Sequence, residues 1–108
     1  MAFKSKASAS IGVSGSATTV SDTVSTGATH TVVGLSLAAV GTANTTASVK
    51  LNKSGGSSAF LIKDGIVPLG GALVVVGGDQ KVVLEEGDSI TAYAGNASSV
   101  DAVLSYLV

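Results

Sequence analysis

Few side chains in this 108-residue sequence could carry out covalent chemistry, and the single histidine, His30, is the first candidate. A serine or threonine nucleophile needs a base such as imidazole beside it and a carboxylate that orients the base. Serine and threonine occur throughout the chain, so their proximity to His30 would carry little information. The sequence therefore favours His30 as a strand residue near the end of a sheet, exposed or hydrogen-bonded, and predicts no catalytic site and no enzyme.

An acidic run, Glu85, Glu86 and Asp88, is the candidate for a cation site, because hard cations bind clustered oxygen ligands. Its spacing does not match the Asp-x-Asp-x-Asp-Gly pattern of an EF-hand loop. Charged residues beside a glycine are more typical of a solvated tight turn. We therefore expect a turn here, with no metal and no other cofactor.

Three glycine pairs, Gly55-Gly56, Gly70-Gly71 and Gly77-Gly78, could in principle cradle a phosphate. Phosphate loops, however, have the spacing G-x-G-x-x-G or G-x-x-x-x-G-K-[ST] and are followed by a helix. Neither pattern occurs in the sequence, so these glycines are expected in turns.

Charge and aromatic content disfavour binding to nucleic acid. Charged residues make up 12% of the chain, the net charge is -1, and all six basic residues are lysines. Proteins that read bases specifically usually present a basic face with arginines. Tyr93 and Tyr106 lack the basic, aromatic-rich sequence neighbourhood of a base-stacking platform. Tyr93 is instead a candidate contact residue, and Tyr106 is expected in the core.

Composition also bounds the class of protein. The chain has no cysteine, so it has neither a disulfide framework nor a thiolate metal site. Its mean hydropathy is +0.55, yet no apolar run approaches the roughly 18 residues of a membrane span. The N-terminus lacks the apolar stretch of a secretory signal. High apolarity with low charge fits either a surface hidden in an assembly or small strand residues that score as hydrophobic.

Short apolar runs separated by turn residues fill the chain, which predicts antiparallel strands. The expected strands cover residues 29–40, 47–52, 59–63, 66–67, 72–76, 81–84, 90–94 and 100–107. Asp64-Gly65 is expected to end one of them. The runs 72–76 and 81–84 flank Gly77-Gly78-Asp79-Gln80 and predict a hairpin. We predict an all-β fold, an antiparallel β-sandwich of jelly-roll type with about eight to nine short strands.

Alternation assigns side chains to faces within these strands. In the last strand, Val100, Ala102, Leu104 and Tyr106 form an inward set, and the opposite set is also partly apolar. The last strand is therefore expected to be central in a sheet or covered by a neighbouring subunit. In the strand over 29–40, the shared faces are expected to be Val33, Leu35, Leu37 and Ala39 on one side, and His30, Val32, Gly34 and Ser36 on the other.

The N-terminal segment 1–15 is expected to be an arm or an edge strand, and residues 16–108 the sandwich domain. Within the segment, Ala7, Ala9, Ile11 and Val13 alternate with polar residues or glycine, which predicts a strand of small side chains.

Several segments in the last three-quarters of the chain carry a resemblance to a known group of proteins. They are Leu61-Ile62-Lys63-Asp64, Val67-Pro68-Leu69-Gly70, Leu84-Glu85 with Gly87-Asp88-Ser89-Ile90, and Ser99-Val100-Asp101 with Leu104-Ser105. In this order they resemble small β-sandwich virion proteins of tailed bacteriophages. The chain departs from that pattern at Thr26-Gly27-Ala28-Thr29, where the group often has Tyr-x-x-Pro.

This resemblance implies a structural virion protein, and a capsid decoration (cement) protein is the favoured interpretation. It implies a homo-oligomer, a trimer by preference, that binds the major capsid protein or other virion proteins on the capsid surface after synthesis in the host cytoplasm. A neck, tail or fibre accessory protein is the first alternative. A carbohydrate-binding module and a small hydrolase are further alternatives. The candidate contact residues are Phe3, Lys4, Lys6, Tyr93 and Leu107.

Overall fold

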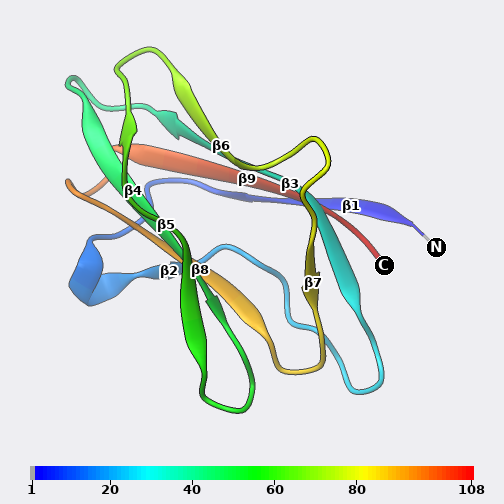
Figure 1. Cartoon of the computed structure of the whole chain (residues 1–108). Helices are drawn as coiled ribbons and strands as arrows, with labels where there is room; N and C mark the ends of the chain where they lie inside the picture. Colours follow the sequence, from blue (N-terminus) through cyan, green and yellow to red (C-terminus); the bar gives the residue numbers. More distant parts are fainter. Residues whose placement is uncertain (1) are drawn as a thin grey trace.

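The computed structural model describes residues 2–108 as two antiparallel sheets packed face to face (Figure 1). The first sheet, called sheet A, contains β1 (Phe3–Ser8), β9 (Val100–Leu107), β3 (His30–Ala39), β6 (Ala72–Val76) and β7 (Val82–Leu84). The second sheet, sheet B, contains β2 (Thr18–Thr19), β8 (Ser89–Ala94), β4 (Thr45–Asn52) and β5 (Ser58–Val67). A single 3-10 turn, Ser14–Ser16, precedes β2. None of the described residues belongs to a helix long and apolar enough to cross a membrane.

The strand order is that of a jelly roll, and the predicted all-β sandwich is confirmed. Sheet A has the order β1-β9-β3-β6, with β7 also on β3, and sheet B has the order β2-β8-β4-β5. The first strand thus pairs with the last, the second with β8, the third with β6 and β7, and the fourth with the fifth. Such nested pairing results when one long antiparallel ribbon of strands is rolled up into two sheets.

The predicted hairpin between residues 72–76 and 81–84 is wrong. Both strands pair antiparallel with β3, β6 with its C-terminal half and β7 with its N-terminal half. They are successive pieces of one edge strand, interrupted by residues 77–81. Gly78 takes a φ of +62° in this interruption, which a residue with a side chain adopts rarely. The glycines therefore lie in a loop that interrupts an edge strand, whereas the sequence suggested a turn that reverses the chain.

A bulge in β3 overturns the predicted faces of that strand. Val32 pairs with Tyr106 and Gly34 with Ser105, so Val33 is an extra residue on the β3 side. Because side chains alternate with a period of two, one extra residue exchanges the two faces. Val32 is consequently buried together with Leu35, although the uninterrupted pattern places them on opposite faces.

The core lies between the sheets and is built from aliphatic side chains. The inward set predicted for β9 is buried as expected, and β9 is a central strand between β1 and β3. The fully buried large side chains are Ile11, Val20, Val32, Leu35, Leu37, Val49, Val67, Val76, Leu84, Ile90, Val100 and Leu104. Ile11 lies after β1 and donates its backbone N–H to the carbonyl of Val100 at 2.9 Å. The chain between β1 and β2 therefore enters the core, while β1 itself contributes no buried residue.

The strand expected to end at Asp64-Gly65 continues to Val67 as part of β5. Asp64 has a φ of +53° and interrupts the regular pairing with β4, so the two residues form an irregularity inside one strand. Its backbone N–H donates to Ser48 Oγ at 2.9 Å, which satisfies the group that leaves the ladder. The strand expected from the alternation at Ala7, Ala9, Ile11 and Val13 does not form. Strand β1 ends at Ser8, and Val13 is exposed.

Candidate interaction surfaces

His30 is the first residue of β3 and lies near the end of the sheet, as expected, but it is 8% exposed and packs against another ring. Its imidazole stacks on Tyr106, with ring centroids 4.8 Å apart and an interplanar angle of 22°. The Tyr106 hydroxyl donates to Asp22 Oδ2, and Lys6 Nζ lies 3.5 Å from Asp22 Oδ1. The hydrogen bond from Tyr106 is the main cause that lowers the pKa of Asp22, and Lys6 lowers it further. The same bond, followed by burial, raises the pKa of Tyr106.

This cluster of Lys6, Asp22, His30 and Tyr106 connects four parts of the chain. We call it the Asp22 tether. Lys6 comes from β1, Asp22 from the segment after β2, His30 from β3 and Tyr106 from β9. Lys6 Nζ also donates to the Ser21 carbonyl at 3.2 Å. Each polar group in the cluster except the imidazole thus has a charged or hydrogen-bonded partner that holds two segments together.

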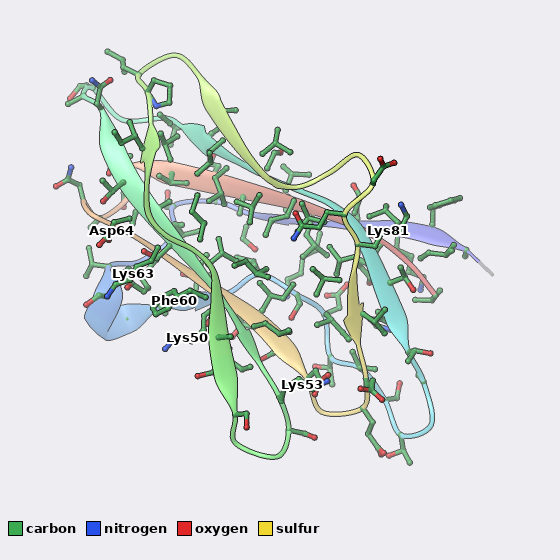
Figure 2. All side chains as sticks on the ribbon, viewed as in Figure 1. Lys50, Lys53, Phe60, Lys63, Asp64 and Lys81 are labelled. Carbon is green, nitrogen blue, oxygen red and sulfur yellow. The ribbon has the colours of Figure 1, made fainter. Side chains whose placement is uncertain are left out.

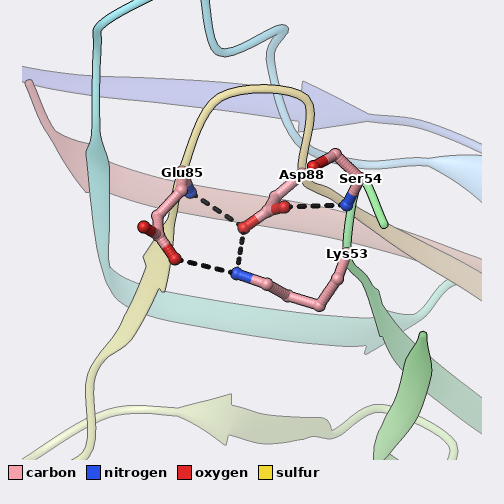
Figure 3. A network of polar contacts seen from close by, with 4 residues as sticks. All are labelled: Lys53, Ser54, Glu85 and Asp88. Carbon is pink, nitrogen blue, oxygen red and sulfur yellow. Dashed lines mark hydrogen bonds and ion pairs between the residues drawn. The ribbon is translucent and has the colours of Figure 1, made fainter. Parts of the chain in front are cut away.

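The acidic turn predicted over residues 85–88 exists, but Asp88 is not solvated. Its side chain is 1% exposed and lies at the centre of the contacts drawn in Figure 3. Asp88 Oδ1 accepts from the Ser54 N–H at 3.0 Å, and Oδ2 accepts from the Glu85 N–H at 2.9 Å and from Lys53 Nζ at 2.5 Å. Lys53 Nζ also contacts Glu85 Oε1 at 3.1 Å. The Lys53 ammonium group therefore occupies the candidate cation site of the sequence, and Glu86 remains exposed in the turn.

We call Lys53, Ser54, Glu85 and Asp88 the Asp88 clasp. Their contacts shift the pKa values of Asp88 and Lys53. The hydrogen bond from Lys53 lowers the pKa of Asp88, with smaller contributions from the Glu85 and Ser54 N–H groups. The hydrogen bonds to Asp88 and then Glu85 raise the pKa of Lys53. The clasp joins the turn between β4 and β5, both in sheet B, to the turn that connects β7 in sheet A with β8 in sheet B. Across residues 2–108, no three His, Asp or Glu side chains are grouped so that they could hold a metal ion.

The outer face of sheet A is largely apolar and almost without charge. Two rows of side chains each cross four of the five strands of this sheet, because directly paired residues share a face. The rows are Ala7, Val103, Ser36 and Val74, and Phe3, Leu107, Thr31 and Val83. Phe3 is 77% exposed, Val74 66% and Val83 51%. Among the described strand residues that point outward from sheet A, Asp101 alone is charged, and its Oδ1 accepts from the Ser10 N–H at 2.8 Å.

The outer face of sheet B has a different chemistry. Thr19, Thr91, Lys50 and Phe60 form one row across its four strands. Lys50 Nζ lies 5.0 Å from the centre of the Phe60 ring, and Lys63 Nζ lies 5.4 Å from it. Tyr93 meets Phe60 edge-on at 6.5 Å, with an angle of 78°. Figure 2 shows Lys63, Phe60 and Lys50 following one another on this side of the molecule. We call Lys50, Phe60, Lys63 and Tyr93 the lysine–aromatic patch.

The five candidate contact residues are distributed over three places. Phe3 and Leu107 are direct cross-strand partners on the outer face of sheet A. Lys4 and Lys6 share the opposite face of β1, and Lys6 belongs to the Asp22 tether. Tyr93 lies on the other sheet, in the lysine–aromatic patch.

Sequence reasoning missed the partners of Tyr93, since it found no basic or aromatic neighbours for this residue. The structure brings Phe60, Lys50 and Lys63 to it from β4 and β5. Alternation could have placed Lys50 and Tyr93 on polar faces of their strands. It could not have placed Lys63 beside Phe60, because an extra residue in β5, Leu61, brings Phe60 and Lys63 to the same face.

Searches of protein-family models, of curated proteins and of solved structures find no match to this chain. Functional inference therefore depends on the residues and surfaces described above.

Proposed function

We propose that this chain is a structural virion protein of a tailed bacteriophage, a capsid decoration protein that binds and stabilises the shell as a homo-oligomer. The observation that carries the proposal is the outer face of sheet A, where Asp101 is the one charged residue among the described outward strand positions. Exposed apolar surface of this extent is typical of interaction sites. The sequence resemblance to small phage virion proteins points to the kind of assembly, and the jelly-roll order is common among viral capsid proteins.

The area of this face limits the size of the interface that it can form. Four strands about 4.8 Å apart and about eight residues long span roughly 500 Å². A stable protein–protein interface buries about 800 Å² on each partner. One face-to-face contact therefore falls short of a lasting dimer. A ring of three subunits, each using this face and a neighbouring edge, supplies several such contacts at once. A subunit that binds only the assembled shell then stabilises it by mass action.

The oligomeric state tests the first half of the proposal. We expect the purified chain to be trimeric by light scattering, and Val74→Asp, on the edge strand β6 of the apolar face, to shift it to monomer. Ile66→Asp is the matched control, because Ile66 is exposed to a similar extent, 70% against 66%, but lies on β5 of sheet B. A monomeric wild-type protein, or equal loss with the control variant, would contradict the use of this face.

Imaging of the particle tests the second half. A capsid decoration protein is present in capsid-wide stoichiometry on the shell lattice. A neck, tail or fibre protein, which shares the fold and differs in its partner, is present at one vertex or along the tail. Density for this chain at those places, and none on the capsid, would replace the decoration role by the accessory role.

A further inference from the structure

The contacts of the lysine–aromatic patch on sheet B reveal no role for it in the fold. Its four side chains lie on the outer face of the sheet, away from the core between the sheets, and Phe60 is 40% exposed. Over residues 2–108, the ion pairs within 4.0 Å use Lys6 and Lys53, so neither Lys50 nor Lys63 has a carboxylate partner. Both ammonium groups lie within 5.4 Å of the same ring centre. They are therefore close enough together for adjacent anionic residues of one ligand to reach both.

The surroundings of the patch are rich in hydroxyl and amide groups. Thr91 and Thr19 lie in the same row as Lys50 and Phe60, and Asn52 Nδ2 donates to Thr91 Oγ1 at 3.1 Å. The face thus combines ring surface, two cations and groups that can exchange hydrogen bonds with hydroxyls. It is an open sheet surface, whose shape suits an extended chain better than a small enclosed molecule.

We propose that the lysine–aromatic patch binds an acidic polysaccharide, a glycan whose sugar rings carry carboxylate or sulfate groups. The ammonium groups of Lys50 and Lys63 pair with the acidic substituents, and the exposed apolar surface of Phe60 and Tyr93 contacts C–H groups of the sugars. The nearby threonines and Asn52 bind sugar hydroxyls. This activity does not depend on the decoration role, because it uses the opposite sheet.

The geometry favours a glycan over a nucleic acid. Bases stack on parallel, accessible ring faces, whereas the Phe60 and Tyr93 rings are nearly perpendicular and two ammonium groups already lie against Phe60. Binding to a nucleic acid also scales with the number of phosphates that are neutralised, and two lysines on a chain of net charge -1 neutralise few. An acidic protein segment would satisfy the lysines but would make no use of the hydroxyl-rich rows.

Isothermal titration calorimetry of the full chain with defined probes tests this proposal. The probes are an oligogalacturonate, a sulfated dextran, neutral dextran and poly-glutamate. We expect the oligogalacturonate or the sulfated dextran to bind, and added salt to weaken the binding. The double variant Lys50→Gln/Lys63→Gln should lower the affinity about tenfold, and Tyr93→Ala several-fold. Lys81→Gln is the control, because Lys81 is exposed and lies in the loop between β6 and β7, outside the patch.

Each other outcome overturns the proposal. If neither acidic glycan binds at millimolar concentration, or if Lys81→Gln weakens binding as much as the double variant, the patch is not the site. If poly-glutamate binds as tightly as the acidic glycans, the patch is a docking site for an acidic protein segment. If neutral dextran binds equally well, the lysines have no part in recognition. Thermal melts of all variants verify that the fold is intact.

Discussion

At the scale of single residues, two carboxylates hold the molecule together across long sequence separations. Asp88 connects two turns through Ser54, Glu85 and Lys53, and Asp22 connects β1 and β9 through Lys6 and Tyr106. Both carboxyl groups have a lowered pKa in the folded protein because a hydrogen-bond donor stabilises their charged form. Their ionisation is therefore linked to stability.

The first prediction concerns acid. A carboxyl whose pKa is lower in the folded than in the unfolded state stabilises the fold above its unfolded pKa, and that stability is lost as the pH falls through the folded pKa. We expect the melting temperature to fall as the pH decreases from about 5 to about 2. Asp88→Asn should lower the melting temperature at pH 7 and make the remaining acid dependence shallower. Asp79→Asn, in the exposed loop before β7, is the control and should leave both unchanged.

The second prediction isolates the Tyr106 hydroxyl. Tyr106→Phe keeps the ring that stacks on His30 and removes the donor to Asp22. We expect a loss of about 1 kcal/mol in the free energy of unfolding, since the carboxylate is partly exposed and can be hydrated instead. The pKa of Asp22, followed by NMR, should rise toward its ordinary value. An unchanged Asp22 titration would show that Tyr106 does not control it. Tyr93→Phe is the matched control.

At the scale of elements, the two edges of sheet A differ in what they contribute. Strand β1 pairs with β9 over six residues but buries none of them, whereas Ile11, three residues after its end, is fully buried. On the opposite edge, β6 and β7 contribute Val76, Val82 and Leu84 to the core. Strand β1 is therefore held mainly by its ladder with β9 and by the contacts of Lys6, whereas Ile11 fixes the following segment in the core.

The third prediction follows from this difference. Deletion of residues 1–8 should leave a cooperatively folded sandwich with an unchanged near-ultraviolet circular dichroism spectrum. Ile11→Ala, although a much smaller change, should cost about 2–4 kcal/mol because it leaves a cavity in the core. Urea unfolding of the two variants measures both values. If the deletion proves more destabilising than Ile11→Ala, β1 is part of the folding unit. The deletion also shows whether β1 takes part in particle binding.

At the scale of the whole molecule, the jelly roll presents two outer faces of different chemistry on opposite sides. The face of sheet A is largely apolar, with Asp101 as the one charge among its described strand residues, and the face of sheet B carries the lysine–aromatic patch. Two faces on one rigid body allow one side to assemble while the other stays accessible.

The fourth prediction is that these faces act independently. Val74→Asp should abolish the oligomer while each subunit keeps its affinity for the acidic glycan, measured per site. Lys50→Gln/Lys63→Gln should lower the affinity for the glycan about tenfold without changing the mass of the oligomer. Light scattering and calorimetry on the same protein preparations give both results. Loss of both properties in either variant would contradict the separation of the faces.

The sequence by itself determined the fold class and much of the core. Alternation of period two and frequent turn residues are local properties, so they identified an all-β chain and the inward set of β9 from Val100 to Tyr106. They also placed Tyr93 on an outward face.

The tertiary structure decided which strands pair and which outward residues become neighbours. Glycines at 77–78 suit both a hairpin and a loop in an interrupted edge, and only the pairing of β6 and β7 with β3 distinguishes the two. An extra residue at Val33 in β3, and another at Leu61 in β5, alter the neighbours without changing any local pattern. The lysine–aromatic patch depends on the second of these, because contacts between residues distant in sequence determine where a strand departs from regular pairing.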